Sequence, residues 1–300
     1  GVNDDGSLNT GTGSIVQNSD TTGLAAKFGD GNWYDATSPG CYCEGWGVSV
    51  NGTTSGYANV STDGGANNLT IGAVTGVTGS TVTTNTSLTS LPGLSVTQAY
   101  SPADTASGVL FKTVVTITNS TGSAVSDVQY VRVMDWDVPP TEFSELVTIK
   151  GTATTTLLAE SGDNGFASAN PLALYSNFTA ACDNADCTDS GPMDHGAYFR
   201  FNFGTLADGD SYTFTIFYGA AGNEAAAIAA IGAEGIELYS LGQNNKTSSA
   251  SDPTFIFGFA GVGGTPVEPP DGGGSVPEPA SLALLGLGLA GLAMRRPKRS

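Results

Sequence analysis

Asp135 and Asp137 are the residues of this chain best spaced for chemistry. Alternate residues of a strand point to the same face, so we expect both carboxyl groups on one face, together with Val131 and Val133. Such a pair could serve as the two carboxyls of a glycoside hydrolase, which lie about 5 to 10 Å apart, or it could bind a metal ion. We favour a structural role, in which a strand ends before Pro139-Pro140 and the aspartates cap turns or accept from backbone amides.

A second group of carboxylates lies further along the chain, in and behind the loop at residues 182–189. Oxygen ligands that gather in one loop suit Ca²⁺, although the spacing does not fit an EF-hand. The candidate calcium ligands are Asp183, Asp186, Asp189 and Asp194. A solvated acidic loop is the favoured alternative, and no other cofactor is expected.

The chain contains a single histidine, His195. A Ser-His-Asp triad would have to use it, but the sequence has no Gly-x-Ser-x-Gly elbow. A histidine-based zinc catalyst needs further imidazoles or a cysteine-rich substitute. We therefore expect a turn histidine beside Asp194 and a protein without a catalytic site. The alternative is an exported glycan hydrolase or carbohydrate-binding protein that uses Asp135 and Asp137.

Four cysteines form two close pairs, Cys41-x-Cys43 and Cys182-x₄-Cys187. An oxidising compartment favours disulfides, and four cysteines allow three connectivities. A bond between Cys182 and Cys187 is local, and we expect it. A bond between Cys41 and Cys43 would close a tight ring, so cross-pairing between the two segments stays open. A four-cysteine zinc site is the other alternative, to which Cys-x-Cys is a poor match.

Acidic side chains dominate the composition. The 300 residues carry a formal charge of −18, and residues 1–276 hold six basic and 27 acidic side chains. Such a surface repels nucleic acid and anionic lipid, so we exclude nucleic acid as a partner. With 42 glycines and only 13% charged residues, the composition is typical of an exported all-β protein.

Alternating apolar residues predict β-strands from about residue 94 onward. Residues 109–117 and 125–138 follow each other across a turn, and we expect them to form a hairpin with Phe111 on the buried face. Aromatic residues alternate along 199–203, 212–218 and 255–259. Their rings can fill the space between two stacked sheets.

One helix and a polar N-terminal region complete the expected folded part. Asn223 is a good N-cap for a helix at 224–231, which ends near Gly232. Within residues 1–90 we expect short strands at 46–50 and 68–74, in the same sandwich, because several aromatic residues there need burial. These aromatic residues are Trp33, Tyr34, Tyr42 and Trp46.

The expected fold class is all-β: a large antiparallel β-sandwich with one short helix, spanning residues 1–262. A division into two smaller sandwiches near residue 93 is the alternative. Residues 263–276 are rich in Gly and Pro and predict a linker.

The C-terminal segment, residues 277–300, has three ordered parts. A Pro277-Glu278-Pro279 motif precedes an apolar run at 280–294, whose length of roughly 22 Å as a helix barely crosses a bilayer. We therefore expect a single C-terminal transmembrane helix. The basic residues behind it should stay cytoplasmic, which places the rest of the chain outside. These basic residues are Arg295, Arg296, Lys298 and Arg299.

The order of these parts resembles the PEP-CTERM sorting signal of Gram-negative bacteria. The resemblance implies export, recognition of the motif by an exosortase-type membrane protease, and membrane anchoring before delivery to the cell surface or extracellular polysaccharide matrix. An ordinary C-terminal anchor is the alternative. Because such a tail presupposes export and the chain begins at Gly1, we expect that a signal peptide has been removed or that the sequence is a fragment.

The middle of the chain, across residues 94–262, is also similar to uncharacterised exported bacterial proteins that carry this tail. The similarity rests on residues 130–140, 163–167, 194–196 and 239–243, and it implies no activity. We therefore expect a non-catalytic protein of the cell surface or extracellular matrix, which touches extracellular polysaccharide through exposed aromatic rings.

Overall fold

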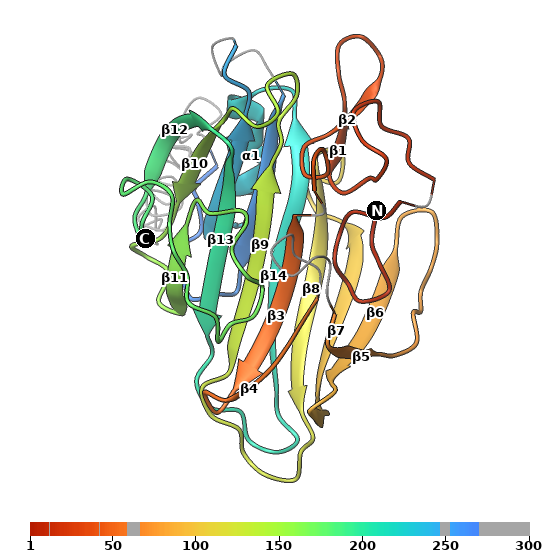
Figure 1. Ribbon diagram of the computed structural model, residues 1–300, viewed down its shortest axis with the longest axis vertical. Coiled ribbons are helices and arrows are strands. Elements are labelled where there is room, and N and C mark those ends of the chain that lie inside the picture. Colours follow the sequence, from red (N-terminus) through yellow and green to blue (C-terminus); the bar gives the residue numbers. More distant parts are fainter. Residues whose placement is uncertain (12, 42, 59–66, 247–252, 270–300) are drawn as a thin grey trace, which may run out of the picture.

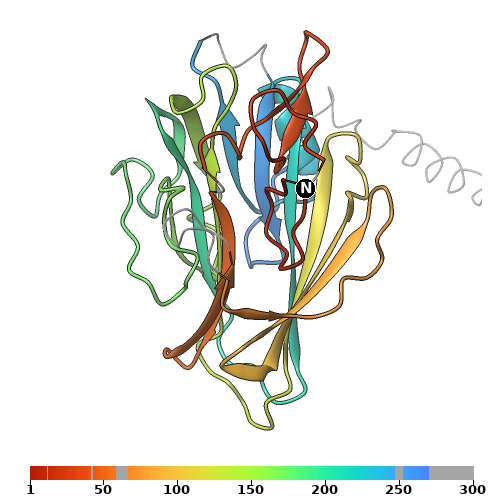
Figure 2. The same ribbon diagram turned by 45° about the vertical axis from the view of Figure 1, so that its right-hand side comes forward.

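Two antiparallel β-sheets face each other and form a sandwich-like body (Figures 1 and 2). The structure is a computed structural model that describes residues 1–269 except 12, 42, 59–66 and 247–252. Among the residues that it describes there is one α-helix, so the expected all-β class is confirmed.

The larger sheet has nine strands in the order β12-β10-β15-β16-β14-β8-β7-β6-β5. In chain order the strands are β5 (Leu69–Ile71), β6 (Val82–Leu88), β7 (Leu91–Pro102), β8 (Leu110–Asn119), β10 (Glu145–Lys150), β12 (Cys187–Met193), β14 (Ser211–Ala221), β15 (Leu238–Gln243) and β16 (Thr254–Ala260).

The smaller sheet has five strands in the order β11-β13-β9-β3-β4, and a separate two-stranded sheet pairs β1 with β2. In chain order these strands are β1 (Ala25–Lys27), β2 (Trp33–Asp35), β3 (Glu44–Val50), β4 (Thr54–Ala58), β9 (Gln129–Trp136), β11 (Leu158–Gly162) and β13 (His195–Asn202).

Aromatic rings fill the space between the two sheets, as their alternation predicts. Phe199 and Phe201 of β13 meet Phe259 of β16, with ring centroids 5.2 and 4.9 Å apart. Phe257 lies 5.6 Å from Phe199, and these four rings are fully buried. Such pairs contribute beyond the apolar area that they bury, so β13 and β16 form the centre of the contact between the sheets.

Residues 109–117 and 125–138 do not form a hairpin, so that prediction is wrong. Strand β8 pairs with β7 and β14, whereas β9 lies in the other sheet between β13 and β3. Both strands bury one face in the same core, so alternation alone does not separate paired neighbours from strands in opposite sheets. The connecting segment crosses between the sheets and is held by reciprocal bonds between the backbones of Val125 and Leu206.

Phe111 is also not on a buried face, since it is 47% exposed. Its strand buries Thr113, Val115 and Ile117 on that side, as the alternation requires. Phe111 lies near the start of β8 opposite Pro102, the last residue of β7. The alternation therefore holds along the strand and fails only near its end, where the neighbouring strand stops.

The expected helix is present as α1 (Glu224–Ala233) on the outer face of the nine-stranded sheet. The Asn223 side chain accepts from the backbone N–H of Ala226 at 2.9 Å, which caps the first turn. Ala227 and Ile231 are buried in a second apolar cluster with residues of β8, β14 and β16. The small alanine side chains allow the helix to approach the sheet closely.

Residues 1–90 contribute strands to both sheets. Strand β3 pairs with β9 in the smaller sheet, and β6 pairs with β7 in the larger one, so strand pairs cross position 93. Trp46 is fully buried, as expected, but Trp33 is 41% exposed because it belongs to the small β1–β2 sheet. Tyr34 is half-buried, and Tyr42 lies outside the described residues.

Residues 263–269, the described part of the expected linker, lie against the sandwich. The backbone N–H of Val267 donates to Ile236 O at 2.9 Å, and that of Gly264 donates to Glu237 Oε2 at 2.9 Å. The Val267 side chain packs against the apolar cluster around α1. The chain therefore leaves the sandwich beside α1.

A buried arginine lies at the centre of the sandwich. The Arg132 side chain projects inward from β9 and is fully buried, where it pairs with the equally buried Glu44 of β3. Its two terminal nitrogens donate to Gln98 Oε1 at 2.8 Å and to Gly6 O at 3.1 Å. The guanidinium carbon also lies 5.6 Å from the ring centre of Tyr218. One charged group thus joins both sheets and the N-terminal segment.

We predict that Glu44→Gln lowers the free energy of unfolding by about 3–5 kcal/mol, because the Arg132 charge would stay buried without a counter-charge. Urea-induced unfolding measures this loss. The matched control is Glu160→Gln, which breaks a 2.7 Å pair with Arg200 whose side chains are 22% and 23% exposed. That pair is partly hydrated, so the control should lose only about 0–1 kcal/mol. Equal losses in the two variants would contradict the central role of Arg132.

Candidate functional site

The end of β9 positions the two aspartates that the sequence singled out. The backbone N–H of Asp135 donates to Cys43 O at 2.8 Å, and that of Asp137 donates to Ala36 O at 2.8 Å. Val131 and Val133 occupy an apolar cluster outside the main core, whereas the inward-facing residues of β9 fill the core. The strand therefore carries a polar end on its outer face.

Two glycines close the outer face over Asp135. A Cβ atom on Gly165 would lie 2.6 Å from Asp135 Cα and 2.9 Å from Asp135 Oδ1. A Cβ atom on Gly196, the partner of Asp135 in β13, would lie 2.7 Å from the same Cα. Only glycine allows such an approach, and the result is that Asp135 is 1% exposed and Asp137 is 0% exposed.

A third carboxylate joins this pair from another part of the chain. Asp194 connects β12 of the larger sheet to β13 of the smaller one. One carboxylate oxygen from each of Asp135, Asp137 and Asp194 lies within 4.8 Å of the other two. We call these three residues the carboxylate cluster. Asp194 is accessible to solvent, so the cluster meets solvent on its side.

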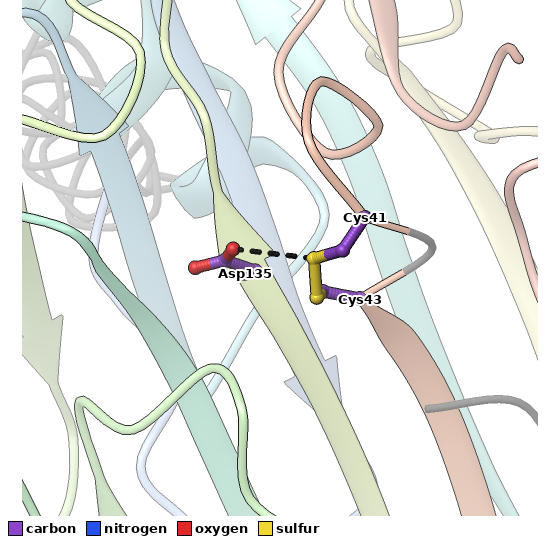
Figure 3. Close-up of side chains that lie close together, drawn as sticks. All are labelled: Cys41, Cys43 and Asp135. Atoms are coloured by element: carbon purple, nitrogen blue, oxygen red, sulfur yellow. Dashed lines mark hydrogen bonds between the residues drawn. A yellow bond between two sulfur atoms is a disulfide. The ribbon is translucent and has the colours of Figure 1, made fainter. Parts of the chain in front are cut away.

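Asp137 meets no backbone amide among the described residues, and Asp135 meets that of its neighbour Trp136, whose hydrogen bond only partly offsets the rise in the pKa of Asp135. Among the described residues, no hydrogen-bond donor reaches either oxygen of Asp137 or Oδ1 of Asp135. Asp135 Oδ2 lies 3.8 Å from Cys41 Sγ (Figure 3). That sulfur is bonded to Cys43 and has no proton to donate. Among the described residues, Asp137 therefore has none of the partners that the predicted structural role requires, and Asp135 has one backbone amide.

Burial raises the pKa of all three carboxyls of the cluster, and neighbouring negative charges raise it further for Asp135 and Asp137. Burial is the larger cause for Asp135 and Asp137, and the charge of Asp194 raises the pKa of both further. Burial also raises the pKa of Asp194 itself. The nearby Glu145 has a pKa raised to about 9 by burial and then by the charges of Asp135 and Asp194. The ionised forms of these carboxyl groups are therefore unfavourable unless a positive charge binds beside them.

His195 has a different environment from the turn expected for it. It begins β13, is fully buried, and donates its backbone N–H to Glu145 Oε1 at 2.9 Å. Its Nδ1 lies 3.5 Å from Asp163 Oδ2. Burial raises the pKa of Asp163, but hydrogen bonds from His195, Thr179 and Phe178 outweigh it and lower the pKa overall.

The other ring nitrogen of His195 meets no nucleophile. No hydroxyl or thiol among the described residues bonds to His195 Nε2. A Cβ atom on Gly191 would lie 3.2 Å from this nitrogen. Within the described residues, the histidine and its aspartate therefore do not form a catalytic triad.

The four predicted calcium ligands do not gather in one place. Asp186 accepts from the backbone and hydroxyl of Thr152 at 2.9 and 2.7 Å. Asp183 is exposed and accepts from the neighbouring Asn184, and Asp189 is exposed on β12. Of these four aspartates, only Asp194 belongs to a group of described residues that could hold a metal ion. The other members of that group are Asp135 and Asp137.

The cysteines form two local disulfides. The Cα atoms of Cys182 and Cys187 lie 5.1 Å apart, and those of Cys41 and Cys43 lie 5.2 Å apart. The structure thus pairs each segment with itself, and the cross-pairing left open by the sequence does not occur. With all four sulfurs bonded in pairs, none is a thiolate that could bind zinc.

Sequence reasoning missed Glu145 and the association of Asp194 with the β9 aspartates. Glu145 follows Asp137 by eight positions, on the first residue of a strand in the other sheet. No spacing rule connects these residues, because their proximity arises from how the two sheets stack. Their one shared signal is position, since each lies at or next to a strand end.

Comparison with known families identifies the C-terminal segment. The PEP-CTERM protein-sorting motif matches residues 275–299, which confirms the resemblance seen in the sequence. No curated protein and no solved structure matches the chain. The motif indicates an exported protein that an exosortase sorts.

The parts of this motif cannot be placed in space. Pro277, Glu278, Pro279, the run at 280–294 and the basic residues behind it all lie outside the described residues. Within the described part of the chain, no helix has the length and apolar character that a bilayer crossing requires.

We predict that protease mapping without reduction finds both local disulfides. Cleavage before Asp183 and Asp186 separates Cys182 from Cys187, so the two pieces should stay joined until a reductant is added. Cleavage after Tyr42 tests the other bond in the same way. Mass spectrometry of the joined peptides checks both pairs. A peptide that joins either segment to the other would contradict this connectivity.

Proposed function

We propose that this PEP-CTERM protein is a non-catalytic component of the cell surface or extracellular matrix, to which an exosortase delivers it. The matched motif at residues 275–299 supports export and sorting. The folded part has a disulfide-bonded β-sandwich and a strongly acidic composition. Such a surface stays soluble and repels anionic polymers.

The burial of Asp135 and Asp137 is the observation that carries the non-catalytic part of this proposal. A glycosidase must bring both carboxyl groups against the scissile bond of a bulky substrate. These two side chains are 1% and 0% exposed, and Gly165 and Gly196 approach the backbone of Asp135 too closely for a sugar ring to enter there. The glycan hydrolase alternative is therefore disfavoured, although both carboxyls have the raised pKa that a general acid needs.

Contact with extracellular polysaccharide is the finer part of the proposal, and exposed aromatic rings would provide it. Trp33 is 41% exposed, Phe143 is 50% exposed and Phe178 is 43% exposed. Flat rings can stack on the apolar faces of sugars, and they need no charge to do so. The net negative charge of residues 1–276 favours neutral polysaccharides over acidic ones.

The tail would act in the membrane before the protein reaches its destination. The run at 280–294 would hold the chain in the bilayer, while the basic residues would keep the end in the cytoplasm. Pro277, Glu278 and Pro279 would then be recognised by the exosortase. Cleavage upstream of Arg295 would free the sandwich from the cytoplasmic end.

We predict that protein extracted from the surface of a host with an exosortase ends upstream of Arg295. Mass spectrometry of the C-terminal peptide checks this. The same chain in a host without the exosortase is the control and should still end at Ser300. Intact tails in both hosts would contradict sorting by cleavage and would indicate a permanent anchor.

We predict that the full chain hydrolyses no member of a panel of neutral and acidic polysaccharides. Release of reducing ends is the measurement, and the double variant Asp135→Asn, Asp137→Asn is assayed beside the wild type. Both should show no release, because neither carboxyl is accessible. Hydrolysis by the wild type that disappears in the double variant, with circular dichroism unchanged, would replace the proposal with a glycosidase.

A further inference from the structure

The carboxylate cluster has the dimensions of a cation site. Its three residues each offer an oxygen, and these oxygens lie within 4.8 Å of one another. Calcium binds oxygen ligands at about 2.3–2.6 Å, so two ligands on opposite sides of one ion lie up to about 5 Å apart. The three oxygens therefore fit around a single ion of this size.

A second observation, independent of this spacing, points to a ligand. Asp137 is 0% exposed, and neither of its oxygens meets a donor among the described residues. Asp135 Oδ1, in a side chain that is 1% exposed, is likewise without a donor there. Buried polar groups are almost always hydrogen-bonded, and buried charges are paired or coordinate metals. Buried oxygens without donors, beside a third carboxylate, are therefore placed to accept a cation.

Among the described residues, His195 partly offsets the rise in the pKa of Asp194 that burial causes, but no positive charge is found to act on the buried Asp135 or Asp137. The four ion pairs found there join Lys112 to Asp104, Arg132 to Glu44, His195 to Asp163, and Arg200 to Glu160. None of them includes a member of the carboxylate cluster. The nearest further carboxylate, Glu145, adds negative charge rather than removing it.

We propose that Asp135, Asp137 and Asp194 bind one calcium ion. The ion supplies the missing charge and accepts the oxygens that have no donor. Asp194, the solvent-accessible member, provides the route by which the ion reaches the two buried carboxylates. This site shares only Asp194 with the four calcium ligands predicted from the sequence, and it does not depend on the destination of the protein.

The donor set selects calcium among the common divalent ions. All three ligands are carboxylate oxygens, which suit hard cations, whereas zinc prefers nitrogen and sulfur. Cys41 and Cys43, which lie next to Asp135 (Figure 3), are bonded to each other and so offer no thiolate. Magnesium holds its water molecules firmly and needs a nearly ideal octahedron, so a mostly buried site of three carboxylates favours the larger ion.

Bound calcium would join the two sheets at this end of the sandwich. Asp135 and Asp137 belong to the end of β9, and Asp194 lies in the connection from the nine-stranded to the five-stranded sheet. An ion that binds the folded chain more tightly than the unfolded chain raises stability by mass action. Calcium is therefore expected to raise the Tm.

The test uses the full chain with its disulfides intact, stripped of metal with a chelator and titrated with CaCl₂ in a calorimeter. The wild type should bind one calcium per chain, and its Tm should rise with calcium concentration. Asp137→Asn keeps the side-chain shape and removes one ligand charge, so its calcium affinity should fall roughly tenfold or more. Its metal-free Tm should equal or exceed that of the metal-free wild type, because one repelling charge is gone.

The matched control is Asp183→Asn, which removes an exposed carboxylate outside the cluster. It should bind calcium and respond in Tm as the wild type does. MgCl₂ and ZnCl₂ titrations should give weaker binding. Absence of calcium uptake by the folded wild type, or equal losses in Asp183→Asn and Asp137→Asn, would overturn the proposal. So would a folded Asp137→Asn variant with unchanged affinity.

Discussion

The charge of Arg132, placed between two sheets, is the constraint on which the rest of the sandwich depends. A guanidinium can stay in such a place only if its hydrogen bonds and its charge are both satisfied. Glu44 supplies the charge, while Gln98 and the Gly6 carbonyl accept from the remaining nitrogens. Glu44 also accepts the backbone N–H of Leu8 at 2.7 Å. The N-terminal segment is therefore part of the buried surroundings of Arg132 in the folded sandwich.

Ionisable side chains are buried on both faces of strand β9, and the hydrogen-bond partners available to them differ between the two faces. On the inner face Arg132 donates to acceptors from three other segments. On the outer face Asp135 and Asp137 are buried to the same degree but have no such partners among the described residues. A protein that satisfies one buried charge so fully has no structural reason to leave others unpaired a few residues away. The contrast within a single strand separates a group that stabilises the fold from groups that are available to a ligand.

The sequence reveals the elements of this fold better than their partners. Alternation of Phe199 with Phe201 and the cap at Asn223 depend on neighbours in the chain, so they predict a strand and a helix correctly. The pairing of β8 and the position of Asp194 depend on how the two sheets stack, which local periodicity does not contain. The same difference between local and tertiary information applies to the candidate site. The sequence indicated that Asp135 and Asp137 share a face, but neither their burial nor the third carboxylate could be predicted.

The tail and the sandwich carry separate kinds of information. The sorting motif acts through a short segment at the C-terminus and requires only that the folded part be exported. The carboxylate cluster requires the complete sandwich, since its residues come from β9 and from the connection between the two sheets. Any exported domain could carry the same sorting motif. The motif therefore cannot explain why tertiary structure brings three acidic side chains together. Their explanation lies in the folded domain itself and not in its sorting signal.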